Sequence, residues 1–438
     1  MEAPIKKSDF MSFSPEAILR DRMGPGATKV SFPLYQEKED GELELVSLST
    51  PGEILHWRKE HPGIPLFVHR NETDSAWGEG EERFVETVES YENLAPADRQ
   101  QRFEDVREDL AEALGDRDVQ KRNEKVWSAS EETFLLVKGA LGQAGALSQG
   151  EYPEENKRVV DDILARLVGH ISDKMETRRL FAQLGDFGDS CTLSHINRVF
   201  LQTMKFLHYF DYNLDRGLET AVEKLFHPGQ RYFLHFERPF RSVFREGLKS
   251  WDKDRLSRAG LAGLFHDVGK IPNLSYFESE ESYDRAAIEA HALKGYELMS
   301  GMGAWAAEAA FVAGSHHEYG GHPSGYGIRR TRPEMAPSPG APNLVSADLG
   351  VVLRGGARDH LLTEVVQIVD VYDGLRCNNR RYRKRAFTEA ETLTIMREMT
   401  RADRKLNLVL FDLFIGFTAA DLTGDDLKST FDASKLLR

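Results

Sequence analysis

The sequence predicts a mainly α-helical protein with a small α+β module at its N-terminus. Three observations lead to this fold class: strand-like runs are confined to residues 1–75, apolar residues then recur at three- and four-residue intervals, and few helix breakers interrupt residues 76–185. Hydrophobic residues make up 40% and charged residues 29% of the 438 residues. This balance is globular and excludes collagen-like, coiled-coil-only and wholly disordered chains.

Charge and cysteine content exclude further classes of protein. The net charge of −14 is the opposite of the basic surface that a general nucleic-acid binder needs. Two cysteines cannot build a disulfide framework and fit a reducing compartment. The longest apolar run, Leu408–Phe417, contains Asp412 and is too short for a membrane span. We therefore expect a cytoplasmic protein that binds neither nucleic acid nor membranes.

The N-terminal module is expected to combine strands with one helix. A helix start is predicted at Ser49-Thr50-Pro51, because proline is favoured at the first helical position. The expected elements are, in order, the strands Val30–Gln36 and Glu42–Ser49 around the turn Asp40-Gly41, a helix ending near Pro62-Gly63, and the strand Ile64–Val68. A small regulatory α+β module is the interpretation of residues 1–75.

Residues 76–185 are acidic and helix-forming. Amphipathic helices are predicted at Arg107–Leu114, Glu131–Leu147 and Val159–Met175, where apolar residues keep helical spacing. We interpret this stretch as a helical connector that serves as a stalk for a homodimer. A plain helical subdomain explains the same pattern equally well.

The strongest local signal for chemistry is the heptapeptide Leu264–Lys270. His266 and Asp267 end an apolar helical run and offer an imidazole nitrogen and a carboxylate that can bridge two metal ions. Lys270 can share their helix face, where its ammonium suits an anionic substrate. Taken alone, the heptapeptide fits a histidine-capped helix end about as well.

Further hard ligands lie on separate helical segments. These are His195, His291, the pair His316-His317 followed by Glu318, and Asp370. Asp370 lies in an apolar helix, where a carboxylate is unfavourable unless it is paired or bound to metal. Each residue alone is more often structural, but together they supply nitrogen and oxygen donors and no Cys-x-x-Cys pair. This set favours two Fe or Mn ions over a structural zinc.

In this order the motifs resemble the HD-GYP family, bacterial members of the HD phosphohydrolase superfamily. The resemblance extends from His195 to Phe417. It also includes Ser324-Gly325-Tyr326-Gly327, Ile368–Leu375 and Asn379–Arg383. The resemblance implies an all-helical domain with a binuclear or trinuclear iron or manganese centre, and hydrolysis of the second messenger cyclic di-GMP.

The resemblance also implies roles for single residues. The metal ligands would be His195, His266, Asp267, His291, His316, His317 and Asp370. Asp267 would bridge the two ions, and Lys270 would contact the phosphate. Both residues would be catalytic. Tyr326 would lie near a guanine base, and Arg380 and Arg383 of the basic cluster 376–385 would hold phosphates. A solvated face or an RNA-binding patch is the alternative for that cluster.

Three differences from the family pattern carry expectations of their own. Cys191 stands where some members have a carboxylate for a third metal, which favours two ions. Residues 214–253 and 329–356 are expected to be insertions, the second one a loop. The family's Gly-Tyr-Pro is Gly325-Tyr326-Gly327 here, so we expect Gly327→Pro, with one glycine of Gly320-Gly321 deleted, to order the loop and improve turnover.

The predicted domains are the N-terminal module 1–75, the connector 76–185, an HD-GYP-like domain 186–420 and a C-terminal tail 421–438. The predicted function is a metal-dependent cyclic di-GMP phosphodiesterase that forms pGpG and GMP in bacterial signalling, with a diguanylate cyclase or other signalling proteins as partners. The alternatives are an HD hydrolase of another nucleotide and a non-catalytic effector that binds metal or nucleotide.

Overall fold

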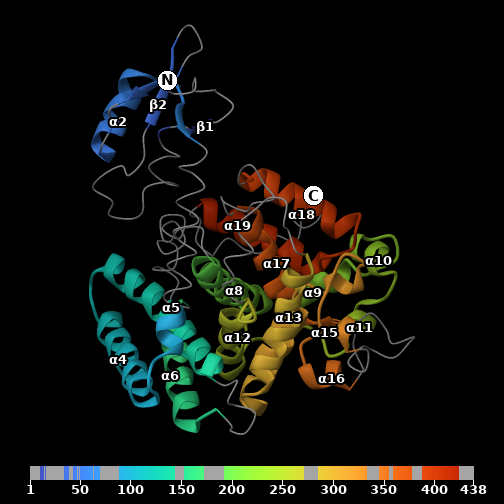
Figure 1. Ribbon diagram of the computed structural model, residues 1–438. Coiled ribbons are helices and arrows are strands. Elements are labelled where there is room, and N and C mark those ends of the chain that lie inside the picture. Colours follow the sequence, from blue (N-terminus) through green and yellow to red (C-terminus); the bar gives the residue numbers. More distant parts are fainter. Residues whose placement is uncertain are drawn as a thin grey trace.

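The structure is a computed structural model, and most of the residues it describes are helical (Figure 1). It describes residues 10–13, 15, 34–38, 43–46, 48, 50–62, 64–69, 88–143, 152–171, 192–270, 285–332, 345–354, 359–376 and 387–423. The predicted mainly α fold class is confirmed. Across these ranges the structure shows no helix long and apolar enough to span a membrane.

The N-terminal module contains an antiparallel sheet with the strand order β1-β4-β2-β3. Its strands are β1 (Phe10–Phe13), β2 (Leu34–Glu37), β3 (Leu43–Val46) and β4 (Leu66–His69). The predicted pairing of these two strands is confirmed, because β2 and β3 pair with Leu34 opposite Val46. The predicted turn Asp40-Gly41 lies outside the described residues. Strand β1 was not predicted. It pairs with β4, which lies far away in the sequence, so short-range patterns do not reveal it.

Helix α2 (Pro51–Glu60) begins where the sequence predicts. The Thr50 hydroxyl accepts a hydrogen bond from the Glu53 backbone N–H at 3.3 Å, and the Glu53 carboxylate accepts one from the Thr50 N–H at 3.0 Å. This capping box satisfies N–H groups that the first helical turn leaves unpaired. The helix ends at Glu60, two residues before the expected Pro62.

Three long helices follow, and they confirm the amphipathic pattern of the connector. They are α4 (Pro96–Leu114), α5 (Val119–Gln143) and α6 (Glu154–Ile171). Phe103, Phe134 and Ile163 lie in the same hydrophobic core as residues of the later helices. The apolar faces are therefore covered within one chain, which is the packing of a helical subdomain. The domain boundaries and the homodimer remain predictions.

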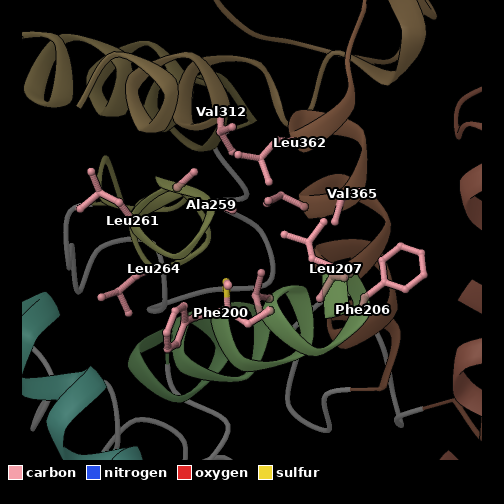
Figure 2. Packing of buried hydrophobic residues seen from close by; sticks show 14 of the residues in the cluster. Phe200, Phe206, Leu207, Ala259, Leu261, Leu264, Val312, Leu362 and Val365 are labelled. Atoms are coloured by element: carbon pink, nitrogen blue, oxygen red, sulfur yellow. The ribbon is translucent and has the colours of Figure 1, made fainter. Parts of the chain in front are cut away.

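Five helices build the C-terminal core. They are α8 (Thr192–Leu214), α12 (Lys253–Phe265), α13 (Arg285–Ser300), α14 (Ala307–Ser315) and α17 (Leu361–Arg376). Helix α12 packs against both α8 and α14, and α17 packs against α8 and α14 as well. Figure 2 shows side chains of four of these helices meeting in one cluster, among them Phe200, Leu261, Val312 and Val365. This packing brings the helix ends that carry ligand-type residues close together.

Helices α18 (Glu389–Arg401) and α19 (Leu408–Thr423) close the described chain. The apolar run noted in the sequence belongs to α19, and Phe411 and Phe414 are completely buried in the core. Asp412 accepts a hydrogen bond from the Arg231 guanidinium at 2.6 Å, so the charge inside this apolar helix is paired. The run is thus a buried core helix.

The described residues of the two expected insertions contain regular secondary structure. The first contains α9 (Leu218–Lys224), α10 (Arg231–Phe236) and α11 (Phe240–Val243). Aromatic rings of α10 and α11 pack against the ring of Phe226. The second was predicted as a loop, and this is wrong for its described parts. They hold most of α15 (Ile328–Thr331), the strand β5 (Val345–Ser346) and α16 (Leu349–Leu353). Strand β5 pairs in parallel with β6 (Asp359–His360), which follows this range. The Asp348 carboxylate caps the N-terminus of α16. This local signal for a helix start was obscured by the proline-rich sequence around it.

Candidate metal centre

Five structural segments bring the predicted ligands to one buried place. His195 lies in the first turn of α8, and His291 lies within α13. His266 and His316 directly follow the last residues of α12 and α14, and Asp370 lies in α17. The predicted ligands, which are His195, His266, Asp267, His291, His316, His317 and Asp370, are all at most 9% exposed. The structure therefore brings together the complete predicted set.

These residues form two groups with one member in common. The first group is His195, His266, Asp267 and Asp370, and the second is Asp267, His291, His316 and His317. Within each group the donor atoms lie within 4.8 Å of one another. Asp267 belongs to both groups, so its carboxylate would be shared if each group held one ion.

The two oxygens of Asp267 face different groups. Its Oδ1 lies 3.2 Å from Nε2 of His291 and 3.5 Å from Nε2 of His316. Its Oδ2 lies 3.5 Å from Nε2 of both His195 and His266. One carboxylate oxygen is thus directed at each half of the site.

Hydrogen bonds to backbone carbonyls orient two of the imidazole rings. Nδ1 of His266 lies 2.9 Å from the Gly263 carbonyl, and Nδ1 of His316 lies 3.1 Å from the carbonyls of Val312 and Ala313. Because a carbonyl can only accept, each Nδ1 carries the proton and donates it. The Nε2 lone pair of each ring is then left for a metal, which is the usual tautomer of a metal-binding histidine.

Unsatisfied buried atoms support a metal in this place. Nε2 of His266, Nε2 of His316 and Oδ1 of Asp267 have no hydrogen-bond partner within the described part of the chain. All three residues are completely buried, and buried polar atoms are rarely left without a partner. Imidazole nitrogens and carboxylate oxygens suit divalent transition metals. The residues present therefore fit a binuclear metal centre.

The electrostatics of the site favour the protonation states that metal binding requires. Burial raises the pKa of Asp267, but Lys270 and His266 outweigh this effect and hold the pKa well below its usual range. Burial also lowers the pKa of His266 to about 4, against the opposing effect of Asp267. Metal ligands must be neutral histidines and ionised carboxylates. His266 and Asp267 are in these states near pH 7.

Two residues that the sequence analysis missed hold His195 in place. Nδ1 of His195 lies 2.7 Å from Oδ2 of Asp373. Arg198 donates to the same carboxylate from Nε at 2.8 Å and from Nη2 at 3.1 Å. Asp373 follows Asp370 by three residues, so helical spacing could have indicated that both carboxylates share a face of α17.

Lys270 lies at the edge of the centre. Its ammonium donates a hydrogen bond to Oδ2 of Asp267, and its side chain is 26% exposed. The lysine is thus both next to the shared carboxylate and accessible to a ligand. Its predicted contact with phosphate remains a prediction.

Tyr326 lies against the histidines of the second group. Its ring centre is 4.6 Å from that of His317 and 5.9 Å from that of His291, and its backbone N–H donates to the His317 carbonyl at 2.9 Å. The structure therefore places the predicted substrate residue Tyr326 beside the candidate ligands. Arg380, Arg383 and Cys191 lie outside the described residues.

The expectation for Gly327→Pro was wrong. Gly327 has φ of 155°, whereas proline requires a φ near −65°. A Cβ at this position would also lie 2.5 Å from the Gly314 carbonyl oxygen. Glycine therefore allows a backbone path that proline would block.

A family model agrees with this geometry. Residues 244–375 match the HD domain, a range that contains every predicted ligand except His195. Among solved structures, the chain is similar to Bd1817, a HDG"Y"P protein from Bdellovibrio bacteriovorus, with 12% sequence identity. The similarity covers 94% of this chain and 100% of that chain, and its TM-score of 0.39 is too low to assign a fold. No curated protein matches the sequence.

The range of the family match contains every candidate ligand except His195. The His266-Asp267 pair, which gives such a domain its name, lies inside the matched range and at the centre of both ligand groups. The predicted HD-type recognition is confirmed. Residues 244–375 of this chain are therefore similar to the HD domain and contain six of the seven candidate metal ligands.

Proposed function

We propose that this protein is a phosphodiesterase that hydrolyses cyclic di-GMP with two divalent ions, Fe or Mn. The observation that carries the proposal is the position of Asp267. Its two oxygens face two different groups of histidines, as a carboxylate that bridges two ions must do. A site for a single structural ion has no need of such a shared carboxylate.

Each protein group has a task in phosphodiester hydrolysis. Paired divalent ions, when bound, polarise phosphoryl oxygens and lower the pKa of a water molecule. The orienting bonds on His266 and His316 hold their Nε2 atoms toward Asp267. The Lys270 ammonium lies beside that carboxylate and is available to stabilise negative charge that develops on the phosphate.

The substrate assignment rests on the residues around the centre. The Tyr326 ring lies against His317 and is only partly buried, so it offers an aromatic surface on which a base can stack. The same tyrosine stands in the motif Gly325-Tyr326-Gly327, which resembles the family's signature. A cyclic dinucleotide has two phosphodiesters and two guanine bases, and this combination suits a cationic edge beside an aromatic ring.

The test is product analysis on protein purified without oxygen and loaded with Fe(II) or Mn(II). We expect cyclic di-GMP to be converted to pGpG and then to GMP, and we expect Asp267→Ala to lose most of the metal and all of this activity. Asp412→Asn is the control, because Asp412 is a buried aspartate in α19 that belongs to neither ligand group.

The same assay includes pGpG and cyclic GMP–AMP as substrates. Turnover of one of these without turnover of cyclic di-GMP would contradict the substrate assignment and favour an HD hydrolase of another nucleotide. Bound metal with no turnover of any of the three would contradict the enzyme proposal and favour a non-catalytic effector.

A further inference from the structure

Helix α5 lies outside the range that matches the HD domain. One face of this helix nevertheless contacts residues that are close in sequence to three candidate ligands. Ser130, Phe134 and Lys138 follow one another at four-residue intervals, so they share one face of the helix. Each of these three side chains contacts a residue close in sequence to a different candidate ligand.

The first two contacts are made to α8 and α12. The Ser130 hydroxyl donates to the side-chain oxygen of Asn197, and the Asn197 amide donates to the Trp127 carbonyl at 3.2 Å. Asn197 lies two residues after His195. The Phe134 ring stacks on Phe265 with 5.5 Å between the ring centres, and Phe265 directly precedes His266.

The third contact is made to the turn that carries Asp267. Lys138 is only 6% exposed, and its Nζ donates to the Val268 carbonyl at 2.7 Å. The next residue, Gly269, is pressed against α13, because a Cβ there would lie 1.9 Å from the His291 carbonyl oxygen. The turn after Asp267 is therefore held by α5 on Val268 and by α13 on Gly269.

We propose that this face of α5 positions the metal centre and that Lys138 is a positioning residue for Asp267. The inference rests on the metal centre of the proposed function. Burying an ammonium is unfavourable unless its hydrogen bonds compensate, and here the bond goes to the peptide next to the shared carboxylate. Because both ligand groups use Asp267, a shift of this turn weakens the binding of both ions.

The test compares Lys138→Met with Lys157→Met. Lys157 is a matched control on α6, since it is 7% exposed and pairs with Glu154 on its own helix. Mn(II) affinity is measured by titration against a fluorescent chelator, and the melting temperature is recorded with and without Mn(II). We expect Lys138→Met to bind Mn(II) about tenfold more weakly, a loss typical of residues that orient ligands. Lys157→Met keeps the wild-type affinity.

The metal-induced rise in melting temperature separates positioning from general stability. We expect Lys138→Met to show a smaller rise than wild type, whereas Lys157→Met shows the full rise even if its metal-free form is less stable. Lys138→Arg keeps a cationic donor and recovers part of the affinity. If Lys138→Met does not fold, Ser130→Ala tests the same face, with a smaller loss of affinity expected.

The outcomes distinguish this inference from the proposed function. Wild-type Mn(II) affinity in Lys138→Met, or in Ser130→Ala where that variant is used, would overturn the role of α5 and leave the metal centre intact. A wild-type protein that binds no Mn(II) or Fe(II) would overturn the metal centre itself, and the positioning role with it.

Discussion

At the scale of single residues, the orientation of His195 depends on a carboxylate that is not itself a candidate ligand. Burial raises the pKa of Asp373, but Arg198 and His195 outweigh this effect and keep the carboxyl ionised. An ionised acceptor 2.7 Å from Nδ1 of His195 places the ring proton on that nitrogen. Nε2 of the ring, 3.1 Å from Asp370, is then presented to the first ligand group.

Replacing this carboxylate by an amide tests the arrangement. We expect Asp373→Asn to weaken Mn(II) binding by roughly 10- to 100-fold, because the amide no longer selects the tautomer and ring position of His195. The measurement is a metal titration of the purified variant. Asp161→Asn is a suitable control, since Asp161 pairs with Trp305 and belongs to neither ligand group. Equal affinity in both variants would contradict a role for Asp373 at the centre.

At the scale of elements, the close approach of α13 to the turn after α12 brings His291 to Asp267. Gly269 and Gly295 allow this approach. A Cβ on Gly269 would lie 2.4 Å from the Gly295 nitrogen, and backbone atoms cannot move aside as a flexible side chain can. The glycine of the His-Asp heptapeptide is thus required by packing between two ligand-bearing segments.

We expect Gly269→Ala to destabilise the protein by about 1–3 kcal/mol or more, the usual effect of overpacking, and to reduce its metal content. Chemical denaturation and elemental analysis measure the two effects. Gly169→Ala in α6 is the control, because a Cβ there meets no atom within 4 Å. Alanine in that helix should be neutral or stabilising. A Gly269→Ala variant as stable as Gly169→Ala would contradict the packing argument.

At the scale of the whole molecule, the candidate centre connects segments that lie far apart in the chain. His195 and Asp370 come from α8 and α17, and the other ligands come from the segments between them. A ligand that binds only the folded arrangement stabilises it by mass action. A metal bound at this centre would therefore act as a tertiary crosslink.

Removal of metal should be visible in global stability. We expect chelation to lower the melting temperature and re-addition of Mn(II) to restore it, with a gain of roughly 2.7 kcal/mol when free metal is one hundred times its dissociation constant. Differential scanning calorimetry measures the change. Asp267→Ala serves as the control and should melt at the same temperature with and without metal. A wild-type melting temperature that does not respond to metal would contradict this expectation.

The candidate ligand set could be predicted from the sequence, because its ordered motifs resemble those of a known family and the donor chemistry of histidine and aspartate is local to each residue. The capping box at Thr50 and the amphipathic helices were likewise predictable, since their signals lie within a few residues. The loop expected at 329–356 is wrong for its described residues, and the structure argues against the benefit expected from Gly327→Pro. The first inference used composition and the second used the family's motif. Neither could show that a Cβ at Gly327 would collide with the Gly314 carbonyl of α14.

By itself, the sequence determined which side chains can bind metal and which segments form helices, because residue type and short-range periodicity carry that information. Only the tertiary structure decided that Asp373 orients His195 from 178 positions away, and that Lys138 of α5 holds the turn after Asp267 from 130 positions away. These contacts depend on how the helices pack against one another. Periodicity marks the face of a helix that is buried, but the partner of that face is selected by packing of the complete core.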